Sequence, residues 1–251
     1  MNSGSIYTHI QNNIATIEFF HPASNSFPSE LLQRLTKEFD VLSLNSEVKV
    51  IVLKSEKEGA FCAGASFDEL MSITNFEEGK QFFLGFAYVI NAMRKCSKLI
   101  IGRVQGKVVG GGVGLAAACD YCLATEQASI KLSELTIGIG PFVIEPAVER
   151  KLGLAALSEL TLDATSWKTA YWAKEKGLFA SVFQTIEELD NEVENLALKL
   201  ASYNPDALTE MKKVFWKNTD NWDKILEQRA GISGELVLSD FTKKALQKFK
   251  N

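Results

Sequence analysis

The fold is best predicted from Gly110-Gly111-Gly112-Val113-Gly114-Leu115-Ala116-Ala117-Ala118-Cys119-Asp120. Three adjacent glycines let a backbone approach a ligand closely because no Cβ stands in the way, and the small residues after them can start a helix. The first N–H groups of that helix lack intrahelical acceptors and lie at the positive end of its dipole. They could stabilise a developing oxyanion on a carbonyl substrate. The alternative is a tight turn between a strand and a packed helix.

A second small-residue turn lies upstream of the glycines. Residues 48–53 are typical of a buried strand and are followed by Gly59-Ala60-Phe61-Cys62-Ala63-Gly64-Ala65-Ser66-Phe67-Asp68-Glu69-Leu70. Two such turns could each offer one N–H to the same carbonyl oxygen, which is the geometry that an enolate intermediate requires. Downstream, Glu134 could supply an acid/base carboxylate.

With these motifs in this order, the chain resembles the crotonase, or enoyl-CoA hydratase/isomerase, superfamily from about Ile6 to the C-terminus. The resemblance implies an α/β fold with a crotonase-like ββα spiral core over residues 1–186. It implies a helical C-terminal subdomain, residues 187–251, for oligomerisation and covering the acyl pocket. It further implies an acyl-CoA substrate, no cofactor beyond the coenzyme A of that substrate, no metal, and a homotrimer or a dimer of trimers.

The same resemblance assigns individual positions. The two oxyanion donors fall on the backbone N–H groups of Ala65 and Gly111, and Ser66 replaces an aspartate that is usual in the family. The implied substrate-binding residues are Ala63, Ala65, Ser66, Phe67, Asp68, Gly111, Gly112, Gly114 and Phe142.

The number of carboxylates bears on the reaction. Hydratases of the family with two glutamates carry one at the position of Gly114 and one at the position of Glu134, so this chain keeps only the second. Hydration needs water activated at C3 and a proton delivered to C2, whereas a single base can shift a double bond. Glu145 is a candidate second catalytic carboxylate. Alternatively, it is a favourable charge at a helix start, with Pro146 at the first helical position.

We expect a hydratase of methylglutaconyl-CoA type, and two alternatives stay open. Gly140-Pro141-Phe142-Val143-Ile144-Glu145-Pro146 is similar to a bacterial subgroup assigned to methylglutaconyl-CoA hydration, which favours a hydratase of that type. The carboxylate count favours an enoyl-CoA double-bond isomerase with Glu134 as sole base. The third hypothesis is a non-catalytic acyl-CoA-binding relative.

The composition of the chain argues against several classes of protein. The chain has 251 residues, 46% hydrophobic and 23% charged, and its net charge of −4 with no basic block predicts no nucleic-acid partner. No run approaches the ~18 apolar residues of a membrane span. The first five residues lack the features of a signal peptide, so we expect a cytoplasmic protein. The candidate cations for the coenzyme A phosphates are Arg103, Lys107, Lys243, Lys244 and Lys248. The candidates for the free carboxylate of a glutaconyl group are Arg103, Lys107 and Arg150.

Local sequence patterns predict the strands and helices. Alternation on both sides of Asn12-Asn13 predicts a hairpin, Pro28 opens a helix, and strands are expected at residues 48–53 and 99–104. After about residue 187 only helices are expected. The four cysteines, Cys119 and Cys122 among them, are expected to be buried, inert thiols.

Overall fold

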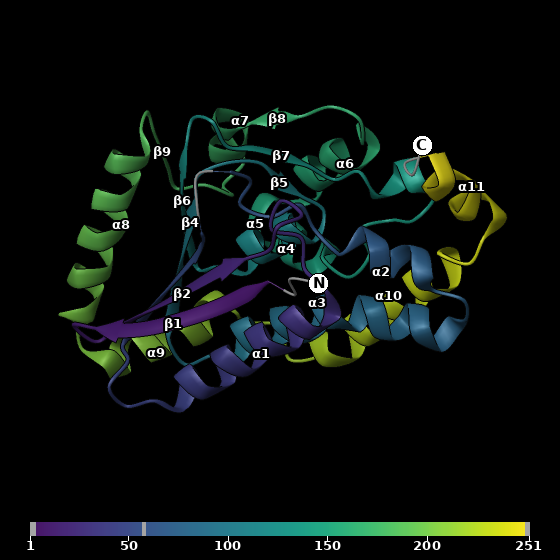
Figure 1. Cartoon of the computed structure of the whole chain (residues 1–251). Coiled ribbons are helices and arrows are strands. Elements are labelled where there is room, and N and C mark those ends of the chain that lie inside the picture. Colours follow the sequence, from purple (N-terminus) through teal and green to yellow (C-terminus); the bar gives the residue numbers. More distant parts are fainter. Residues whose placement is uncertain (1–3, 57–58, 249–251) are drawn as a thin grey trace.

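The computed structural model describes residues 4–56 and 59–248 of the chain (Figure 1). A six-stranded sheet has the order β1-β2-β3-β4-β6-β9, and a three-stranded sheet has the order β5-β7-β8. The large sheet comprises β1 (Ser5–Gln11), β2 (Ile14–Phe20), β3 (Val50–Ser55), β4 (Leu99–Val104), β6 (Tyr121–Thr125) and β9 (Ser181–Phe183). The small sheet comprises β5 (Val108–Val109), β7 (Ser129–Lys131) and β8 (Lys168–Thr169).

The N-terminal hairpin forms as predicted. Strands β1 and β2 are antiparallel, whereas every later pairing within the large sheet is parallel. Asn12 and Asn13 have φ values of 53° and 62°, and Asn tolerates this left-handed conformation in a two-residue hairpin loop. Strand β4 has the predicted bounds. Strand β3 begins two residues later than predicted because the Val48 N–H is bonded to Asn45 in the preceding turn.

One face of the large sheet packs against helices, and this packing forms the main core. These helices are α1 (Ser29–Leu44), α3 (Phe76–Lys95), α4 (Gly111–Ala118) and α10 (Trp222–Leu236). The helix after Pro28 is confirmed, with its apolar side buried as its periodicity predicts. Helices α3 and α10 touch through glycines, since a Cβ on Gly79 would lie 2.9 Å from the carbonyl oxygen of Gly234.

The other face of the sheet is covered by α8 (Ile186–Ala201), which stands apart from the remaining helices in Figure 1. Its start is fixed by a capping box between Thr185 and Glu188. The buried side of α8, with Leu189 and Val193, packs on Val52 and Ile101 of the sheet.

The remaining helices surround this framework. They are α2 (Phe67–Ser72), the 3₁₀ helix η1 (Glu134–Ile137), α5 (Glu145–Leu152), α6 (Leu154–Leu162), α7 (Ala170–Glu175), α9 (Pro205–Phe215) and α11 (Asp240–Lys248). From Ile186 onward the described chain contains helices only, which confirms the predicted helical C-terminal region. Helix α11 packs on η1, where a Cβ on Gly138 would lie 2.7 Å from Thr242 Oγ1. None of the helices in the described residues is long and apolar enough to cross a membrane.

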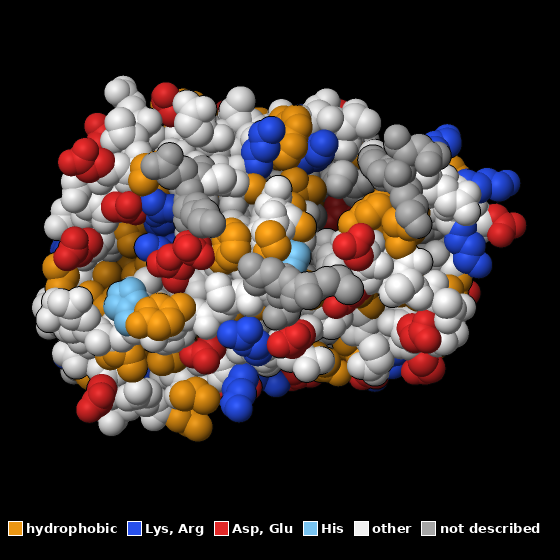
Figure 2. All heavy atoms as spheres, in the orientation of Figure 1, with side chains coloured by type: hydrophobic (Ala, Val, Ile, Leu, Met, Phe, Trp, Pro, Cys, Tyr) orange, Lys and Arg blue, Asp and Glu red, His pale blue; other side chains and the backbone are white. Residues whose placement is uncertain are grey.

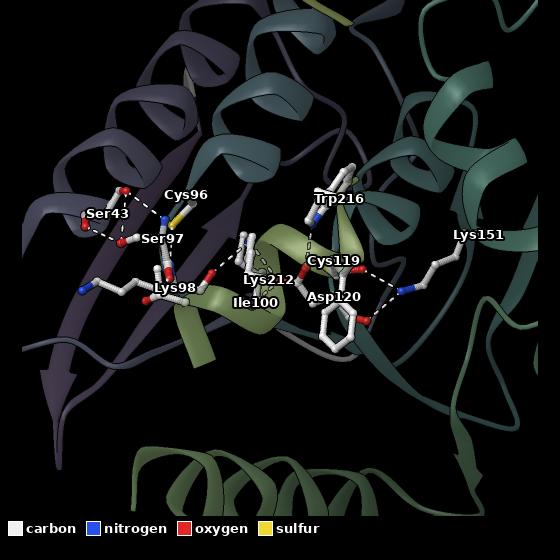
Figure 3. A network of polar contacts seen from close by, with 12 residues as sticks. Ser43, Cys96, Ser97, Lys98, Ile100, Cys119, Asp120, Lys151, Lys212 and Trp216 are labelled. Carbon is white, nitrogen blue, oxygen red and sulfur yellow. Dashed lines mark hydrogen bonds and ion pairs between the residues drawn. The ribbon is translucent and has the colours of Figure 1, made fainter. Parts of the chain in front are cut away.

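A buried polar network joins α9 to the end of α4 (Figure 3). The Asp120 carboxylate accepts from the Ile100 N–H at 2.8 Å, from Lys212 Nζ at 2.9 Å and from Trp216 Nε1 at 2.8 Å. Lys151 Nζ donates to the carbonyl oxygens of Cys119 and Asp120. The Asp120 and Lys212 side chains are 4% and 3% exposed, so a charge left alone there would be costly. The network therefore fixes α9 against β4.

The four cysteines are buried free thiols, as predicted. Cys119 and Cys122 lie beside Gly102, where an added Cβ would come within 3.0 Å of Cys119 Sγ and 2.6 Å of Cys122 Sγ. Within the described residues, no group of three or more His, Cys, Asp or Glu side chains is placed to hold a metal ion.

Candidate active site

The two predicted small-residue turns border one cleft. The cleft holds about 170 Å³ of space for water-sized molecules and about 780 Å³ when its open mouth is included. Its walls are glycines and apolar side chains from α2, α3 and the stretch after η1. The polar side chains among the described lining residues are Ser133, Glu134 and Ser233. Glu134 is thus the one ionisable group of the described lining.

The first turn presents the Ala65 N–H to this cleft. Phe27 holds the turn, because its N–H donates to Gly64 at 2.8 Å and its carbonyl oxygen accepts from Ser66 at 3.0 Å. Gly64 has a φ of +91°, which favours glycine. Within the described residues the Ala65 N–H has no acceptor. It is available to a ligand oxygen.

The second turn presents the Gly111 N–H at the first position of α4. Gly110, with a φ of +53°, donates its own N–H to the Lys131 carbonyl oxygen at 3.0 Å. The Gly111 N–H has no acceptor in the described part of the chain. A Cβ on Gly64 would lie 3.5 Å from the Gly111 nitrogen, so the two turns are in contact. Both candidate oxyanion donors therefore lie in one cleft.

The other glycines of the motif do not line the cleft. A Cβ on Gly112 would meet Cys62 Sγ at 2.9 Å. A Cβ on Gly114 would clash with the Ile144 side chain, whose Cβ is 2.7 Å away. The space where a second family carboxylate would start is therefore occupied by Ile144. Gly112 and Gly114, both predicted to bind substrate, act here as close packing positions.

Glu134 opens η1 and its carboxylate lies against Gly110. A Cβ on Gly110 would stand 2.9 Å from Glu134 Oε1, so glycine makes room for the carboxylate. Glu134 Oε2 is buried and has no hydrogen-bond partner among the described residues. Burial raises the pKa of Glu134 to about 7. A carboxyl group poised near neutrality can both accept and return a proton.

This raised pKa predicts a pH dependence of stability. Native Glu134 keeps a proton that the unfolded chain, with an ordinary pKa of 4.5, releases between pH 4.5 and 7. The free energy of unfolding should therefore fall with rising pH in this window, by about 3 kcal/mol in total. The variant Glu134→Gln should lack this pH-dependent contribution to the free energy of unfolding. Urea titrations of both proteins at pH 5 and pH 8 therefore measure the contribution of Glu134. Equal pH dependence in the two proteins would contradict the raised pKa.

Glu145, the second carboxylate suggested by the sequence, lies outside the cleft lining. It is the first residue of α5, and Pro146 is the second rather than the first. Its Oε2 is 3.1 Å from Arg229 on α10. Burial is the main cause that raises the pKa of Glu145, and a hydrogen bond with Glu149 raises it further. Glu145 therefore does not share the cleft lining with Glu134.

Of the remaining predicted substrate-binding residues, some line the cleft and others do not. Ala63, Phe67 and Phe142 line the cleft together with Ala65 and Gly111. Ser66 instead caps α2, accepting from the Glu69 N–H at 3.3 Å, which is a role that an aspartate at this position would also perform. Asp68 lies on the exposed side of α2, away from the lining.

Several lining side chains were not among the individually predicted binding residues, Phe86, Ser133 and Ser233 among them. Phe86 of α3 packs against Gly111, Ser133 precedes Glu134, and Ser233 comes from α10. Phe86 belongs to the periodic apolar side of a long helix, which cannot be told from core by pattern alone. Ser233 follows Ser133 by a hundred positions, so only tertiary packing brings them together.

Comparison with known proteins places the chain in a family. The family profile described as Enoyl-CoA hydratase/isomerase matches residues 9–251, so the chain belongs to this family. A Bacillus subtilis (strain 168) protein named "Probable enoyl-CoA hydratase" is 27% identical over 240 residues, covering 94% of this chain and 92% of that protein. The peroxisomal Delta(3,5)-Delta(2,4)-dienoyl-CoA isomerase of Arabidopsis thaliana is 27% identical over 232 residues, covering 86% and 82%.

A third relative matches a shorter stretch. The mitochondrial methylglutaconyl-CoA hydratase of Rattus norvegicus is 32% identical over 167 residues, which are 66% of this chain and 52% of that protein. Among solved structures, an enoyl-CoA hydratase from Bacillus halodurans superimposes with a TM-score of 0.89 at 21% identity, covering 97% of this chain and 99% of that chain. This likeness confirms the expected crotonase-like fold.

Proposed function

We propose that the protein shifts the double bond of an enoyl-CoA thioester, with Glu134 as the sole proton carrier. The observation that carries the proposal is a cleft with two N–H groups free for a thioester oxygen and one buried carboxylate. Membership of the enoyl-CoA hydratase/isomerase family indicates that the substrate is a coenzyme A thioester. A structural carboxylate would be expected to have partners, whereas Glu134 Oε2 has none in the described residues. This argues against a purely binding role.

The reaction follows from this arrangement. The thioester oxygen accepts from Ala65 and Gly111, and the Glu134 carboxylate removes a proton from C2 of a 3-enoyl group. The electron pair of that C–H bond enters the conjugated system, and negative charge develops on the oxygen between the two N–H donors. Protonated Glu134 then gives its proton to C4, the double bond moves to C2–C3, and the carboxylate is restored.

The walls of the cleft favour an uncharged acyl group. The described lining contains no Lys, Arg or His, and aromatic side chains such as Phe82, Phe83 and Phe86 contribute much of it. A free carboxylate on the acyl group would lose its hydration there without a partner. The predicted cation candidate Arg103 is held by Asp190, with hydrogen bonds of 2.7 and 3.0 Å.

Hydration of methylglutaconyl-CoA type is the second candidate. It is favoured by the 32% identity to the rat enzyme over 167 residues. Glu134 alone would then have to activate water for attack on C3 and deliver its proton to C2. The filled Gly114 position weighs against this candidate, because the described lining of the cleft holds no second carboxylate for that water.

An assay in deuterated water separates the candidates. Purified protein is incubated with 3-hexenoyl-CoA, crotonyl-CoA and 3-methylglutaconyl-CoA, and products are followed by NMR and mass spectrometry. The proposal predicts conversion of the 3-enoyl to the 2-enoyl thioester without added water. Hydration of either 2-enoyl thioester as the dominant activity would replace the proposal with the second candidate, and no reaction on any of them would contradict both.

The Gly114 position offers a further prediction. Gly114→Glu alone should clash with Ile144 and destabilise the protein by about 1–3 kcal/mol. Gly114→Glu combined with Ile144→Ala should accommodate the new carboxylate beside Glu134 and raise crotonyl-CoA hydration at least tenfold. Ile144→Ala alone is the control for the added space. A folded double variant without any gain in hydration would show that the missing carboxylate does not limit this reaction.

We also propose that the protein is cytoplasmic and that it assembles from three or six copies of the chain. A homotrimer or a dimer of trimers predicts three or six times the mass of 27.7 kDa in sedimentation equilibrium. A monomer at micromolar concentration would contradict it.

A further inference from the structure

Ser233 is a polar side chain in the apolar part of the cleft. It lies on α10 and lines the cleft together with Leu70 of α2, Phe82 of α3 and Ile139. These three apolar residues belong to one buried cluster, which Val237, one turn further along α10, also joins. On the face shown in Figure 2, hydrophobic side chains are grouped where α2 lies in Figure 1. A hydroxyl group among such side chains calls for a hydrogen-bond partner.

The Ser233 hydroxyl has no such partner in the described part of the chain. The residue is 1% exposed, so bulk water does not supply one freely. A helical serine or threonine commonly donates to the carbonyl oxygen one turn earlier, as Thr36 of α1 does to Leu32 at 2.9 Å. Ser233 makes no equivalent bond within the described residues. Its Oγ therefore keeps its donor and its acceptor capacity for a ligand in the cleft.

Ser233 lies far from the candidate oxyanion donors along the cleft. Phe86 of α3 is next to one of these donors, because a Cβ on Gly111 would collide with its ring. About two turns earlier on α3, Gly79 touches the neighbour of Ser233, since a Cβ on Gly79 would lie 3.0 Å from Gly234 Cα. Two turns of an α-helix rise roughly 10 Å. Ser233 is thus placed to meet the distal part of an acyl chain rather than its reacting carbon atoms.

Packing alone does not require a hydroxyl group at this position. The close crossing of α3 and α10 is made by Gly79 and Gly234, and alanine beside them would take no more space than Ser233 does. Alanine would also favour the helix more strongly than serine. A buried hydroxyl without a partner lowers stability. This cost is removed when a substrate atom supplies the missing hydrogen bond.

We propose that Ser233 determines acyl-group specificity by hydrogen bonding to an uncharged oxygen, of a hydroxyl or a keto group, on the distal part of the acyl chain. The inference rests on the proposed enoyl thioester substrate and extends it from the reacting carbon atoms to the far end of the acyl group. A serine hydroxyl both donates and accepts, so either kind of oxygen can bind. A terminal carboxylate fits less well, because the described lining contains no cation.

Calorimetric binding of saturated acyl-CoA thioesters tests this contact without turnover. The acyl chains have about six to ten carbon atoms, to span the roughly 10 Å of two helical turns, and end in a methyl, a hydroxyl or a carboxylate group. At the chain length that reaches Ser233, the hydroxyl should raise affinity about 5- to 10-fold over the methyl group. The carboxylate should bind more weakly than either. Ser233→Ala should abolish the preference for the hydroxyl, and its smaller, helix-favouring side chain should leave the fold intact.

Ser158→Ala on α6 is the matched control, because Ser158 is exposed and lies outside the described lining. This variant should keep the preference for the hydroxyl. The proposal would be overturned by the absence of that preference at every chain length, by its persistence in Ser233→Ala, or by tightest binding of the carboxylate.

The binding results are separate from the proposed reaction. A hydroxyl preference that is lost in Ser233→Ala supports the contact even if no 3-enoyl thioester is isomerised. Isomerisation of 3-hexenoyl-CoA by a protein without any hydroxyl preference would refute the contact and leave the proposed function standing.

Discussion

Glu134→Gln is expected to lower turnover of the enoyl thioester by about 10² to 10⁴ while leaving thioester affinity nearly unchanged. The amide keeps the shape of the side chain against Gly110 but cannot carry the proton. The two backbone donors, Ala65 and Gly111, are untouched, so the thioester oxygen should still be bound. Steady-state kinetics together with calorimetric binding of a saturated acyl-CoA measure the two effects separately.

Glu145→Gln is the matched control for this prediction. It makes the same chemical change at the carboxylate that faces Arg229 outside the cleft lining. Turnover within about threefold of the unaltered protein is expected. If Glu145→Gln lost as much activity as Glu134→Gln, a two-carboxylate mechanism would replace the single carrier.

Lys212→Met is expected to lower the free energy of unfolding by about 3–5 kcal/mol. The substitution leaves the Asp120 charge buried with only the Ile100 N–H and Trp216 Nε1 as partners. These two donors do not replace the lost cation. Urea unfolding at pH 7 measures the difference.

The neighbouring Lys213→Met is the control for Lys212→Met. Lys213 contacts Glu210 at 2.6 Å, but both side chains are well exposed, so a change within about 0.5 kcal/mol is expected. Asp120→Asn combined with Lys212→Met should recover part of the loss, because no charge then stays buried. A loss below 1 kcal/mol for Lys212→Met would show that the network is not a main support of α9.

Much of the fold could be predicted because local patterns and tertiary packing agree. The hairpin at Asn12-Asn13 depends on turn chemistry, and β4 is indicated by its apolar residues Leu99, Ile100, Ile101 and Val104. The catalytic candidates followed from motif and resemblance, and the structure brings Ala65, Gly111 and Glu134 to one cleft. Ala65 and Gly111 are defined by backbone shape, which a short sequence encodes.

What could not be predicted depends on contacts between distant segments. No pattern indicates that Ile144 fills the space beside Gly114, or that Arg229 of α10 pairs with Glu145. The Lys131–Trp167 contact likewise joins β7 to the residue that precedes β8. Such side-chain neighbours are set by the packing of the whole chain.

Deuterium exchange at C2 of butyryl-CoA tests the central claim most directly. This saturated thioester can form the enolate without hydration or a double-bond shift, so the result does not depend on which overall reaction occurs. In deuterated water, the unaltered protein should exchange the C2 protons and Glu134→Gln should do so at least 10²-fold more slowly. Equal exchange rates in the two proteins, or no exchange by the unaltered protein with the thioester bound, would contradict the assignment of Glu134 as the proton carrier.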